Sequence, residues 1–239
     1  MKRALVTGAS GGIGAAIAAQ LARDGLHVVV HAHSNPERAE SVVDAIRVTG
    51  GSAETVVFDV ADGNTCGAAL EKLLTAGPIQ VVVNNAGIHD DATLAGMNLQ
   101  QWSRVVDVSL HGFFNVTQPL LLPMLRTRWG RVISVSSIAA VMGNRGQVNY
   151  AAAKAGLHGA SKSLALEVAS RGVTVNVVAP GIILSAMTET VFSSAQIEAM
   201  VPMKRAGGVD EVAHLVSFLV SPKAEYISGQ VISINGGMG

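Results

Sequence analysis

Two residues four positions apart in this 239-residue chain have the chemistry to move a proton. Tyr150 is followed by Lys154, and on a helix such a pair lies on one face, so that the ammonium stands beside the phenol. A neighbouring positive charge favours the phenolate, so we expect Lys154 to lower the pKa of Tyr150 from about 10. Ser137, thirteen residues earlier, offers a hydroxyl to a substrate carbonyl. The pattern predicts acid–base chemistry at a carbonyl, although the same spacing also fits an ordinary helix with a solvated lysine.

A glycine-rich segment near the N-terminus predicts a site for the phosphates of a nucleotide. It reads Thr-Gly-Ala-Ser-Gly-Gly-Ile-Gly at positions 7–14, between a short apolar run and an alanine-rich stretch. Glycines let the backbone turn tightly and approach a pyrophosphate, and free N–H groups at a helix start bind its charge. The spacing differs from the general G-x-G-x-x-G fingerprint, and a tight turn without a ligand is the alternative. The predicted contacts are Gly8, Ser10, Gly11, Gly12, Ile13 and Gly14.

The end of the second predicted strand indicates which nucleotide binds. An acid there would bond the ribose 2′-hydroxyl of NAD and repel the 2′-phosphate of NADP. The sequence instead reads Val-His-Ala-His-Ser-Asn at positions 30–35, with no acid before Glu37. We therefore predict NADP(H), bound by His33, Ser34 and Asn35 with Arg38 within reach. The alternative is that these polar residues only cap the following helix.

Two further turns are expected at the same edge of the sheet. Asp59 and Val60 close the third predicted strand, and Asn85, Ala86 and Gly87 follow the fourth. An aspartate there can accept a hydrogen bond from an adenine amino group, and small residues leave room for the nucleotide. Each turn alone is ordinary; together they predict one binding crevice beside the phosphate loop.

Short β-branched runs alternate with helix-length segments along the whole chain. The runs lie at 3–7, 28–32, 55–59, 80–83, 131–135, 173–178 and 230–234, and helices are predicted at 13–24, from position 36, and at 99–126, 150–170 and 209–220. This alternation indicates βαβ units with right-handed crossovers and a parallel sheet. We expect an α/β fold in a single domain spanning 1–239.

One stretch interrupts the alternation. Residues 185–208 are rich in methionine and follow the end of a predicted strand, which is where open α/β sheets bind their ligands. Long connections inside compact domains are often functional. We expect this stretch to cover the substrate; an ordinary surface insertion is the alternative.

Composition excludes several classes of function. Lysine and arginine together number 17, as do aspartate and glutamate, so the chain lacks the basic excess typical of nucleic-acid binding. No run of eighteen apolar residues predicts a membrane span. The single cysteine, Cys66, allows no internal disulfide and suits the cytoplasm, and no Cys/His spacing predicts a metal site.

Taken in order, these motifs resemble those of the short-chain dehydrogenase/reductase family, over essentially the whole chain. Within that family the chain is similar to β-ketoacyl-[acyl-carrier-protein] reductases; positions 141–156 and 230–238 look most like reductases of polyketide or aryl-polyene type. The resemblance implies a Rossmann-like, doubly wound sheet of seven strands and hydride transfer from NADPH to the ketone of a carrier-bound 3-oxoacyl thioester.

The same resemblance implies a role for each matched residue. Tyr150 would protonate the carbonyl oxygen, Ser137 would orient it, and Lys154 would bond the nicotinamide ribose. The carboxamide end of the cofactor would lie against Pro180, Gly181 and Ile183, and the acidic carrier protein would dock on Arg128 and Arg171, which would flank the cleft. Relatives of this kind are usually tetramers, so we expect a homotetramer.

Three positions depart from the family pattern. Ser109 stands where the family has its fourth catalytic residue, an asparagine that helps hold a water beside the lysine, which puts the proton relay in doubt. Gly11 stands where NADP-preferring relatives usually carry a basic side chain. Ser185 replaces a threonine but keeps the hydroxyl.

Two other functions remain open from the sequence. One is a dehydrogenase or reductase of a different small alcohol or ketone, such as a sugar or a steroid. The other is a catalytically silent nucleotide-binding regulator, which Ser109 would favour and the intact set of Ser137, Tyr150 and Lys154 opposes.

Overall fold

The computed structural model describes residues 1–184 and 193–239 of the chain. Seven parallel strands form one sheet in the order β3-β2-β1-β4-β5-β6-β9. They are β1 (Arg3–Val6), β2 (His27–Ala32), β3 (Ser52–Val57), β4 (Val81–Asn84), β5 (Gly130–Val135), β6 (Val173–Pro180) and β9 (Val231–Ile234). The expected seven-stranded, doubly wound sheet is confirmed.

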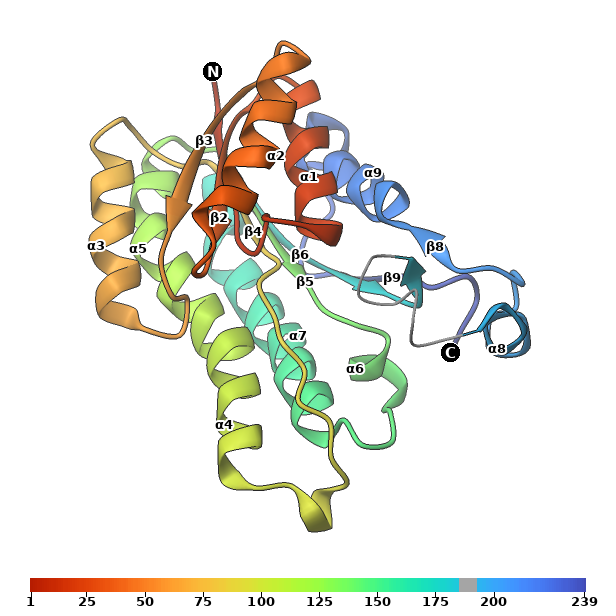
Figure 1. Ribbon diagram of the computed structural model, residues 1–239. Helices are drawn as coiled ribbons and strands as arrows, with labels where there is room; N and C mark the ends of the chain where they lie inside the picture. The colour runs from red at the N-terminus through yellow and green to blue at the C-terminus, as the bar shows by residue number, and fades with distance from the viewer. Residues whose placement is uncertain (185–192) are drawn as a thin grey trace.

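Helices cover both faces of this sheet (Figure 1). On one face lie α1 (Gly12–Arg23), α2 (Pro36–Val48) and α9 (Val209–Val220). The other face carries α3 (Gly63–Leu74), α5 (Gly112–Arg126) and α7 (Val148–Val168), and α4 (Leu99–Val106) packs on α7. The short helix α6 (Ala139–Met142) precedes α7. Because helices cover both faces of the sheet, β1 and β4 are buried along their whole length.

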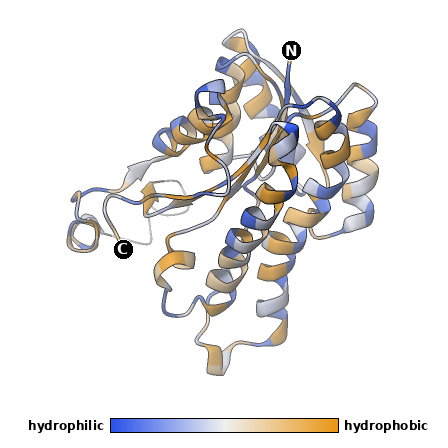
Figure 2. Ribbon diagram, turned by 180° about the vertical axis from the view of Figure 1, so that it is seen from behind, coloured by the Kyte–Doolittle hydropathy of each residue, from blue (hydrophilic) through white to orange (hydrophobic). Residues whose placement is uncertain are grey.

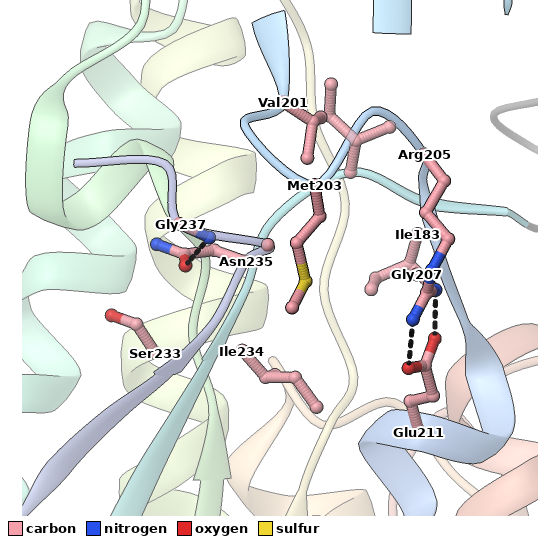
Figure 3. Close-up of a pocket in the computed structure, with 12 residues that line it drawn as sticks. Ile183, Val201, Met203, Arg205, Gly207, Glu211, Ser233, Ile234, Asn235 and Gly237 are labelled. Atoms are coloured by element: carbon pink, nitrogen blue, oxygen red, sulfur yellow. Dashed lines mark hydrogen bonds and ion pairs between the residues drawn. The ribbon is translucent and has the colours of Figure 1, made fainter. Parts of the chain in front are cut away.

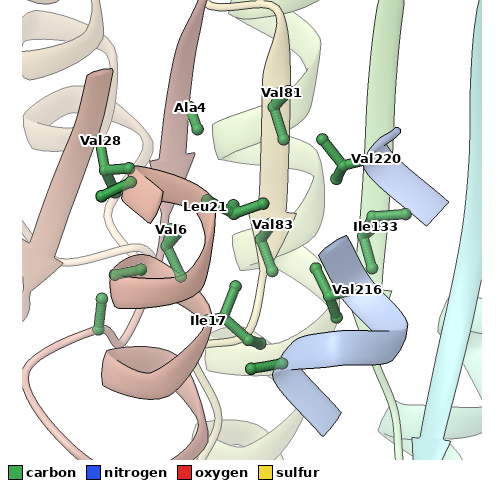
Figure 4. Close-up of a cluster of buried hydrophobic side chains, with 14 of the residues drawn as sticks. Ala4, Val6, Ile17, Leu21, Val28, Val81, Val83, Ile133, Val216 and Val220 are labelled. Carbon is green, nitrogen blue, oxygen red and sulfur yellow. The ribbon is translucent and has the colours of Figure 1, made fainter. Parts of the chain in front are cut away.

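Two hydrophobic cores hold the layers together. In the first, Ile17 and Leu21 of α1 and Val216 of α9 pack on Val6 and Val83 from the sheet (Figure 4). The second lies under the opposite helices, and its fully buried members include Leu5, Leu70, Val82, Leu120 and Val175. Seen from behind, apolar ribbon faces inward along these helices while polar segments turn outward (Figure 2). The sheet is therefore held in a rigid, close-packed frame.

Local sequence signals explain several helix ends. The Asn35 side chain accepts a hydrogen bond from the Arg38 backbone N–H at 3.1 Å, and Pro36 opens α2, as expected for an N-cap followed by proline. Gly25 follows α1 with φ of +84°, a conformation that favours glycine. These two ends lie where the sequence placed them.

Several elements differ from the expected boundaries, and α7 begins and ends two residues earlier than 150–170. Strand β3 begins and ends earlier than 55–59, and β6 continues to Pro180, two residues beyond its expected end. The helical stretch expected at 99–126 is present at both ends but is broken by a π-helical turn, Asp107–His111, between α4 and α5. A π-turn inserts an extra residue, and periodicity alone does not reveal it.

Part of the stretch 185–208 is described. Residues 185–192, including Ser185, lie outside the described residues. Helix α8 (Ser194–Met200) follows, capped by Ser193, and the short strands β7 (Ile183–Leu184) and β8 (Gly207–Gly208) pair in parallel. In the described ranges 1–184 and 193–239, no helix is long and apolar enough to cross a membrane.

Candidate active site

The predicted site residues lie at the carboxyl edge of the sheet. The chain leaves β1 for β2 on one side and later places β4 on the other side of β1. Between β1 and β4 the strand order therefore reverses, which opens a crevice beyond the carboxyl ends where α/β sheets bind ligands. The turns after β1, β4, β5 and β6 all meet this edge, and they carry most of the predicted residues.

Ser137, Tyr150 and Lys154 come from two neighbouring elements. Ser137 follows β5, and its Oγ accepts a hydrogen bond from the Ala139 backbone N–H at 3.2 Å. Tyr150 lies in the first turn of α7, half-buried, with its phenol in a hydrogen bond to the Ser137 side chain. Lys154 follows one turn later. The structure thus brings together the three residues that the sequence predicted.

Lys154 is almost completely buried at the base of this group. Its Nζ donates a hydrogen bond to the Val135 carbonyl oxygen at 2.9 Å and lies 5.8 Å from the centre of the Tyr150 ring. A Cβ on Gly87 would come within 2.9 Å of the same Nζ, so the turn after β4 approaches the ammonium closely. Burial lowers the pKa of Lys154 to about 8, because desolvation penalises the charged form.

Within the chain itself the pKa of Tyr150 is raised and not lowered, and Lys154 is not among the groups that shift it. Burial raises the pKa of the Tyr150 phenol; the hydrogen bond to Ser137 lowers it by less, and the nearby Asp91 carboxylate raises it further. The reason is that desolvation disfavours the phenolate, while the Lys154 ammonium is itself destabilised by burial and directed to the Val135 carbonyl. Tyr150 is therefore held as a neutral phenol, which is the form that donates a proton.

The glycine-rich loop is fixed to the turn after β4. The Thr7 Oγ1 accepts hydrogen bonds from the backbone N–H groups of Asn85 and Ala86, both at 3.0 Å. The Asn85 side chain donates back to the carbonyl oxygens of Thr7 and Gly8. A Cβ on Gly14 would lie 2.3 Å from the Gly8 carbonyl oxygen and 2.6 Å from Asn85 Nδ2. Glycine at position 14 is therefore required for the loop and helix α1 to pack this closely.

The outer side of the loop can take the phosphates of a dinucleotide. Gly12 has φ of +57° and is exposed, and no atom lies within 4 Å of the position that a Cβ would occupy. Ser10, Gly11 and Ile13 flank it at the start of α1, each only partly buried. This open backbone, with free N–H groups at a helix start, fits a pyrophosphate.

Asp59 and Val60 lie in the turn after β3, at the same edge of the sheet. One Asp59 carboxylate oxygen accepts a hydrogen bond from the Ala61 N–H at 2.9 Å, and the same oxygen is 3.6 Å from Nδ1 of His33. Asn115 of α5 donates from Nδ2 to the Val60 carbonyl oxygen, which ties this turn to α5. The turn is thus held in place while the Asp59 side chain stays partly exposed.

The opposite end of the crevice is formed by the end of β6. The Gly181 N–H donates to the Ile234 carbonyl oxygen at 2.9 Å, and a Cβ on Gly181 would collide with the Asn235 backbone. Pro180 and Ile183 are buried on either side. Ile183 also lines a hollow of about 370 Å³ beyond β9, together with Met203 and the paired side chains of Arg205 and Glu211 (Figure 3). Ser137 and Tyr150 do not line this hollow.

Comparison with known proteins decides the family. The model of the short chain dehydrogenase family matches residues 2–196. The chain belongs to the short-chain dehydrogenase family. It is therefore an oxidoreductase that works with a nicotinamide cofactor, and the expected resemblance is confirmed.

Relatives with assigned names cover nearly the whole chain. It is 43% identical over 240 residues to "3-oxoacyl-[acyl-carrier-protein] reductase FabG" of Aggregatibacter actinomycetemcomitans, with 98% of each chain covered. Proteins of the same name from Staphylococcus aureus (strain Mu50) and Pseudomonas aeruginosa are 45% and 42% identical, covering 99% of this chain and 98% and 97% of their own lengths.

Ser109, which stands where the family usually has an asparagine, is buried in the helix layer beside α7. It lies in the π-helical turn Asp107–His111 and is 4% exposed. Within the described part of the chain, its Oγ has no hydrogen-bond partner. The next residue, Leu110, packs closely on Gly156 of α7, where a Cβ would come within 3.1 Å. The turn is therefore pressed against the helix that carries Tyr150 and Lys154.

Arg128 and Arg171 do not flank the crevice within one chain. Both are exposed, and the Arg128 carbonyl oxygen would lie 2.4 Å from a Cβ on Gly172, so the segments that carry the two arginines touch. They precede β5 and β6, however, and so lie at the amino edge of a parallel sheet, opposite Ser137 and Tyr150. The expectation that they border this chain's own active site is wrong, because strand direction separates the two edges.

Sequence reasoning missed two residues that position the site. The imidazole of His31 is buried under the glycine-rich loop: Nδ1 accepts the Gly8 N–H at 3.0 Å and Nε2 lies 2.9 Å from the Phe58 carbonyl oxygen. Asn149 donates to the carbonyl oxygens of Asp90 and Gln101 and accepts the Tyr150 N–H. Asn149 could have been suspected from its place beside Tyr150, whereas His31 had no signal beyond its position at the end of β2.

The residues that the structure describes form no metal site. No group of three or more histidine, cysteine, aspartate or glutamate side chains is arranged to hold an ion there.

Proposed function

We propose that this short-chain dehydrogenase reduces the 3-keto group of an acyl thioester carried by acyl-carrier protein, with NADPH as the hydride source. The observation that carries the proposal is the convergence of Ser137, Tyr150 and Lys154 at the crevice of a chain 42–45% identical, almost end to end, to reductases named for this reaction. The cofactor supplies a hydride to the ketone carbon. The carbonyl oxygen takes the proton, and the product is the 3-hydroxyacyl thioester.

Each catalytic side chain then has a part that its surroundings suit. Tyr150, a neutral phenol with a raised pKa, donates the proton to the substrate oxygen. Ser137, hydrogen-bonded to that phenol, orients the same oxygen. Lys154 lies against the turn at Gly87 and would bond the nicotinamide ribose there. Ser109 lies in the π-helical turn that packs on α7, the helix that carries Tyr150 and Lys154.

The preference for NADPH rests on the end of β2. No carboxylate follows β2 before Glu37, and Ser34 is exposed, so no acid of this turn itself repels a 2′-phosphate. The Asn35 side chain caps α2. We therefore propose that His33 and Ser34 are the side chains of this turn that lie beside the 2′-phosphate. The remaining cofactor contacts that we propose are Gly8 and Ser10 to Gly14 for the pyrophosphate, Asp59 and Val60 for adenine, and Asn85 to Gly87, Pro180, Gly181 and Ile183 towards the nicotinamide.

We extend the proposal to the assembly. Several large apolar side chains are exposed on the helices of one face, among them Phe114 and Leu122 of α5 and Leu166 of α7. A second copy of the chain covering them would hide this apolar surface, and a homotetramer would result from two such contacts. The exposed Arg128 and Arg171 offer positive charge to an acidic carrier protein.

The remaining parts of the proposal concern the whole chain. Residues 1–239 would act as one dinucleotide-binding and catalytic domain, with the acyl chain lying under the stretch 185–208. A reducing compartment suits the buried thiol of Cys66, so we place the enzyme in the cytoplasm.

A substrate panel tests this function against other ketones. NADPH oxidation is followed with acetoacetyl thioesters of coenzyme A and of acyl-carrier protein, and in parallel with a sugar ketone and a steroid ketone. We expect kcat/KM for the thioesters to exceed that for the other ketones by at least tenfold. Faster reduction of the sugar or the steroid would replace the proposed substrate, and no turnover with any ketone would favour a silent nucleotide-binding protein.

A further inference from the structure

The guanidinium of Arg38 lies over the glycine-rich loop. Its Nη2 is 3.1 Å, and its Cζ 3.9 Å, from the position that a Cβ would occupy on Gly11. Arg38 comes from the first turn of α2, directly after the end of β2, whereas Gly11 precedes α1. One cation thus bridges the two segments between which the adenosine ribose of a dinucleotide lies in this class of fold.

This guanidinium has no competing anion among the described residues. No ion pair or side-chain hydrogen bond involving it is formed in the ranges 1–184 and 193–239; the only hydrogen bond of Arg38 beyond the helix is from its backbone N–H to Asn35. Of the acidic residues on α2, Glu40 is engaged by Arg47 and Thr55. Arg38 is exposed and lines a hollow between α1 and α2, which Ser10 and Arg23 also line. A full positive charge is therefore available to a ligand.

A side chain at position 11 would meet the Arg38 guanidinium and would not strain the backbone. The φ of Gly11 is 169°, an extended conformation that any residue adopts. The absence of a side chain at position 11 leaves the space over the loop to a cation that arrives from α2.

We propose that Arg38 binds the 2′-phosphate of NADPH and sets the preference for NADPH over NADH, taking the place of a basic side chain at position 11. The inference rests on the proposed NADPH-dependent function and names the residue that decides it. A phosphate beside a guanidinium forms charge-assisted hydrogen bonds, which NADH lacks the group to accept.

Arg38→Gln tests the proposal, with Arg23→Gln as the matched control from the same hollow. Initial rates with one acetoacetyl thioester give kcat/KM for NADPH and for NADH, and fluorescence titration gives both dissociation constants. We expect Arg38→Gln to lower kcat/KM for NADPH roughly 10–100-fold through KM, with NADH changed by about twofold at most. Arg23→Gln should leave both values close to the parent's. The inhibitor 2′,5′-ADP should bind the Arg38 variant correspondingly more weakly.

A second substitution returns the positive charge from the other segment. Adding Gly11→Arg to the Arg38→Gln variant returns a cation to the same place, so at least a tenfold recovery with NADPH alone is expected. If Arg38→Gln lowered kcat/KM equally for NADPH and NADH, or left the ratio of the two values unchanged, the role of Arg38 would be overturned. The parent's preference for NADPH would still stand. A parent that prefers NADH would overturn the cofactor proposal itself, and the inference on Arg38 with it.

Discussion

The ammonium nitrogen of Lys154 lies 5.8 Å from the centre of the Tyr150 ring, and burial moves the pKa values of the two side chains in opposite directions. The phenol is harder to ionise and the ammonium easier to neutralise than in water. Both shifts have one cause, the removal of water from the group of residues at the carboxyl end of β5. The site therefore keeps a neutral proton donor next to a lysine that carries charge at a cost.

Replacing Lys154 with methionine should stabilise the protein while abolishing its activity. Between pH 8 and 10.5 the unfolded chain binds the lysine proton more tightly than the folded chain, so this group's contribution to stability increases with pH there. At pH 7 the buried Lys154 is charged, so the full free-energy cost of burying its charge is present. We expect Lys154→Met to raise the free energy of unfolding by about 1–3 kcal/mol at pH 7, after loss of the hydrogen bond to Val135.

Urea unfolding of both proteins at pH 7 and pH 10 checks this. The advantage of the methionine variant should shrink at the higher pH. A variant that is less stable at pH 7, or an advantage that does not change with pH, would mean that Lys154 is not buried as a costly charge.

Ser109 should tolerate the residue that the family usually has. The Ser109 hydroxyl is buried without a partner in the described part of the chain, so it contributes little that an amide could not replace. We expect Ser109→Asn to keep or raise kcat, measured by NADPH oxidation. Ser109→Ala serves as the control and should raise the free energy of unfolding by about 1 kcal/mol. A hundredfold loss of kcat in Ser109→Asn would show that the serine has a role of its own.

The order of the elements could be predicted from the sequence because each signal was local. Alternating apolar runs gave seven strands within a few residues of their observed bounds, and Asn35 and Gly25 marked helix ends. Ser137, Tyr150 and Lys154 could be placed together because spacing and strand direction fix which edge they share. These are properties of short segments, which sequence patterns record well.

What could not be predicted depends on contacts between distant segments. The pKa of Tyr150 follows from burial, which the i, i+4 spacing with Lys154 does not report. His31 meets Gly8 only after β2 pairs beside β1. The place of Arg128 and Arg171, by contrast, follows from strand direction and could have been predicted; matching motifs one by one ignored it.

His31 should matter through the loop that it supports. Its neutral imidazole accepts the Gly8 N–H, and burial lowers the pKa of His31 to about 4, partly offset by the hydrogen bond to the Phe58 carbonyl. Removing the ring nitrogens leaves the buried Gly8 and Phe58 groups unpaired. We expect His31→Phe to raise KM for NADPH about tenfold or more, with a smaller change in kcat, in steady-state assays at pH 7.

The pH dependence of stability separates this role from simple packing. The unfolded chain binds the imidazole proton more tightly than the folded chain between about pH 6.5 and 4, so the parent loses stability as pH falls through that window. The difference in unfolding free energy between parent and His31→Phe should shrink by up to about 3 kcal/mol over that window. A difference independent of pH would contradict a buried neutral histidine.

Glycine at position 14 should be indispensable. A Cβ there would come within 2.3 Å of the Gly8 carbonyl oxygen, so Gly14→Ala must displace the phosphate loop. We expect at least a tenfold weaker affinity for NADPH by fluorescence titration. Gly67→Ala in α3 is the matched control: no atom lies within 4 Å of its Cβ position, and it should add about 0.5–1 kcal/mol of stability with binding unchanged. Equal affinity in both variants would contradict the close packing of loop and helix.

The central claim is that the Tyr150 phenol gives its proton to a ketone held beside a bound nicotinamide nucleotide. Turnover of acetoacetyl thioester with NADPH by the parent and by Tyr150→Phe, each with its NADPH dissociation constant, tests it most directly. We predict turnover in the parent and at least a hundredfold lower kcat in the variant, with NADPH affinity within about threefold, because only the hydroxyl is lost. Comparable turnover in the two proteins, or none in the parent, would contradict it.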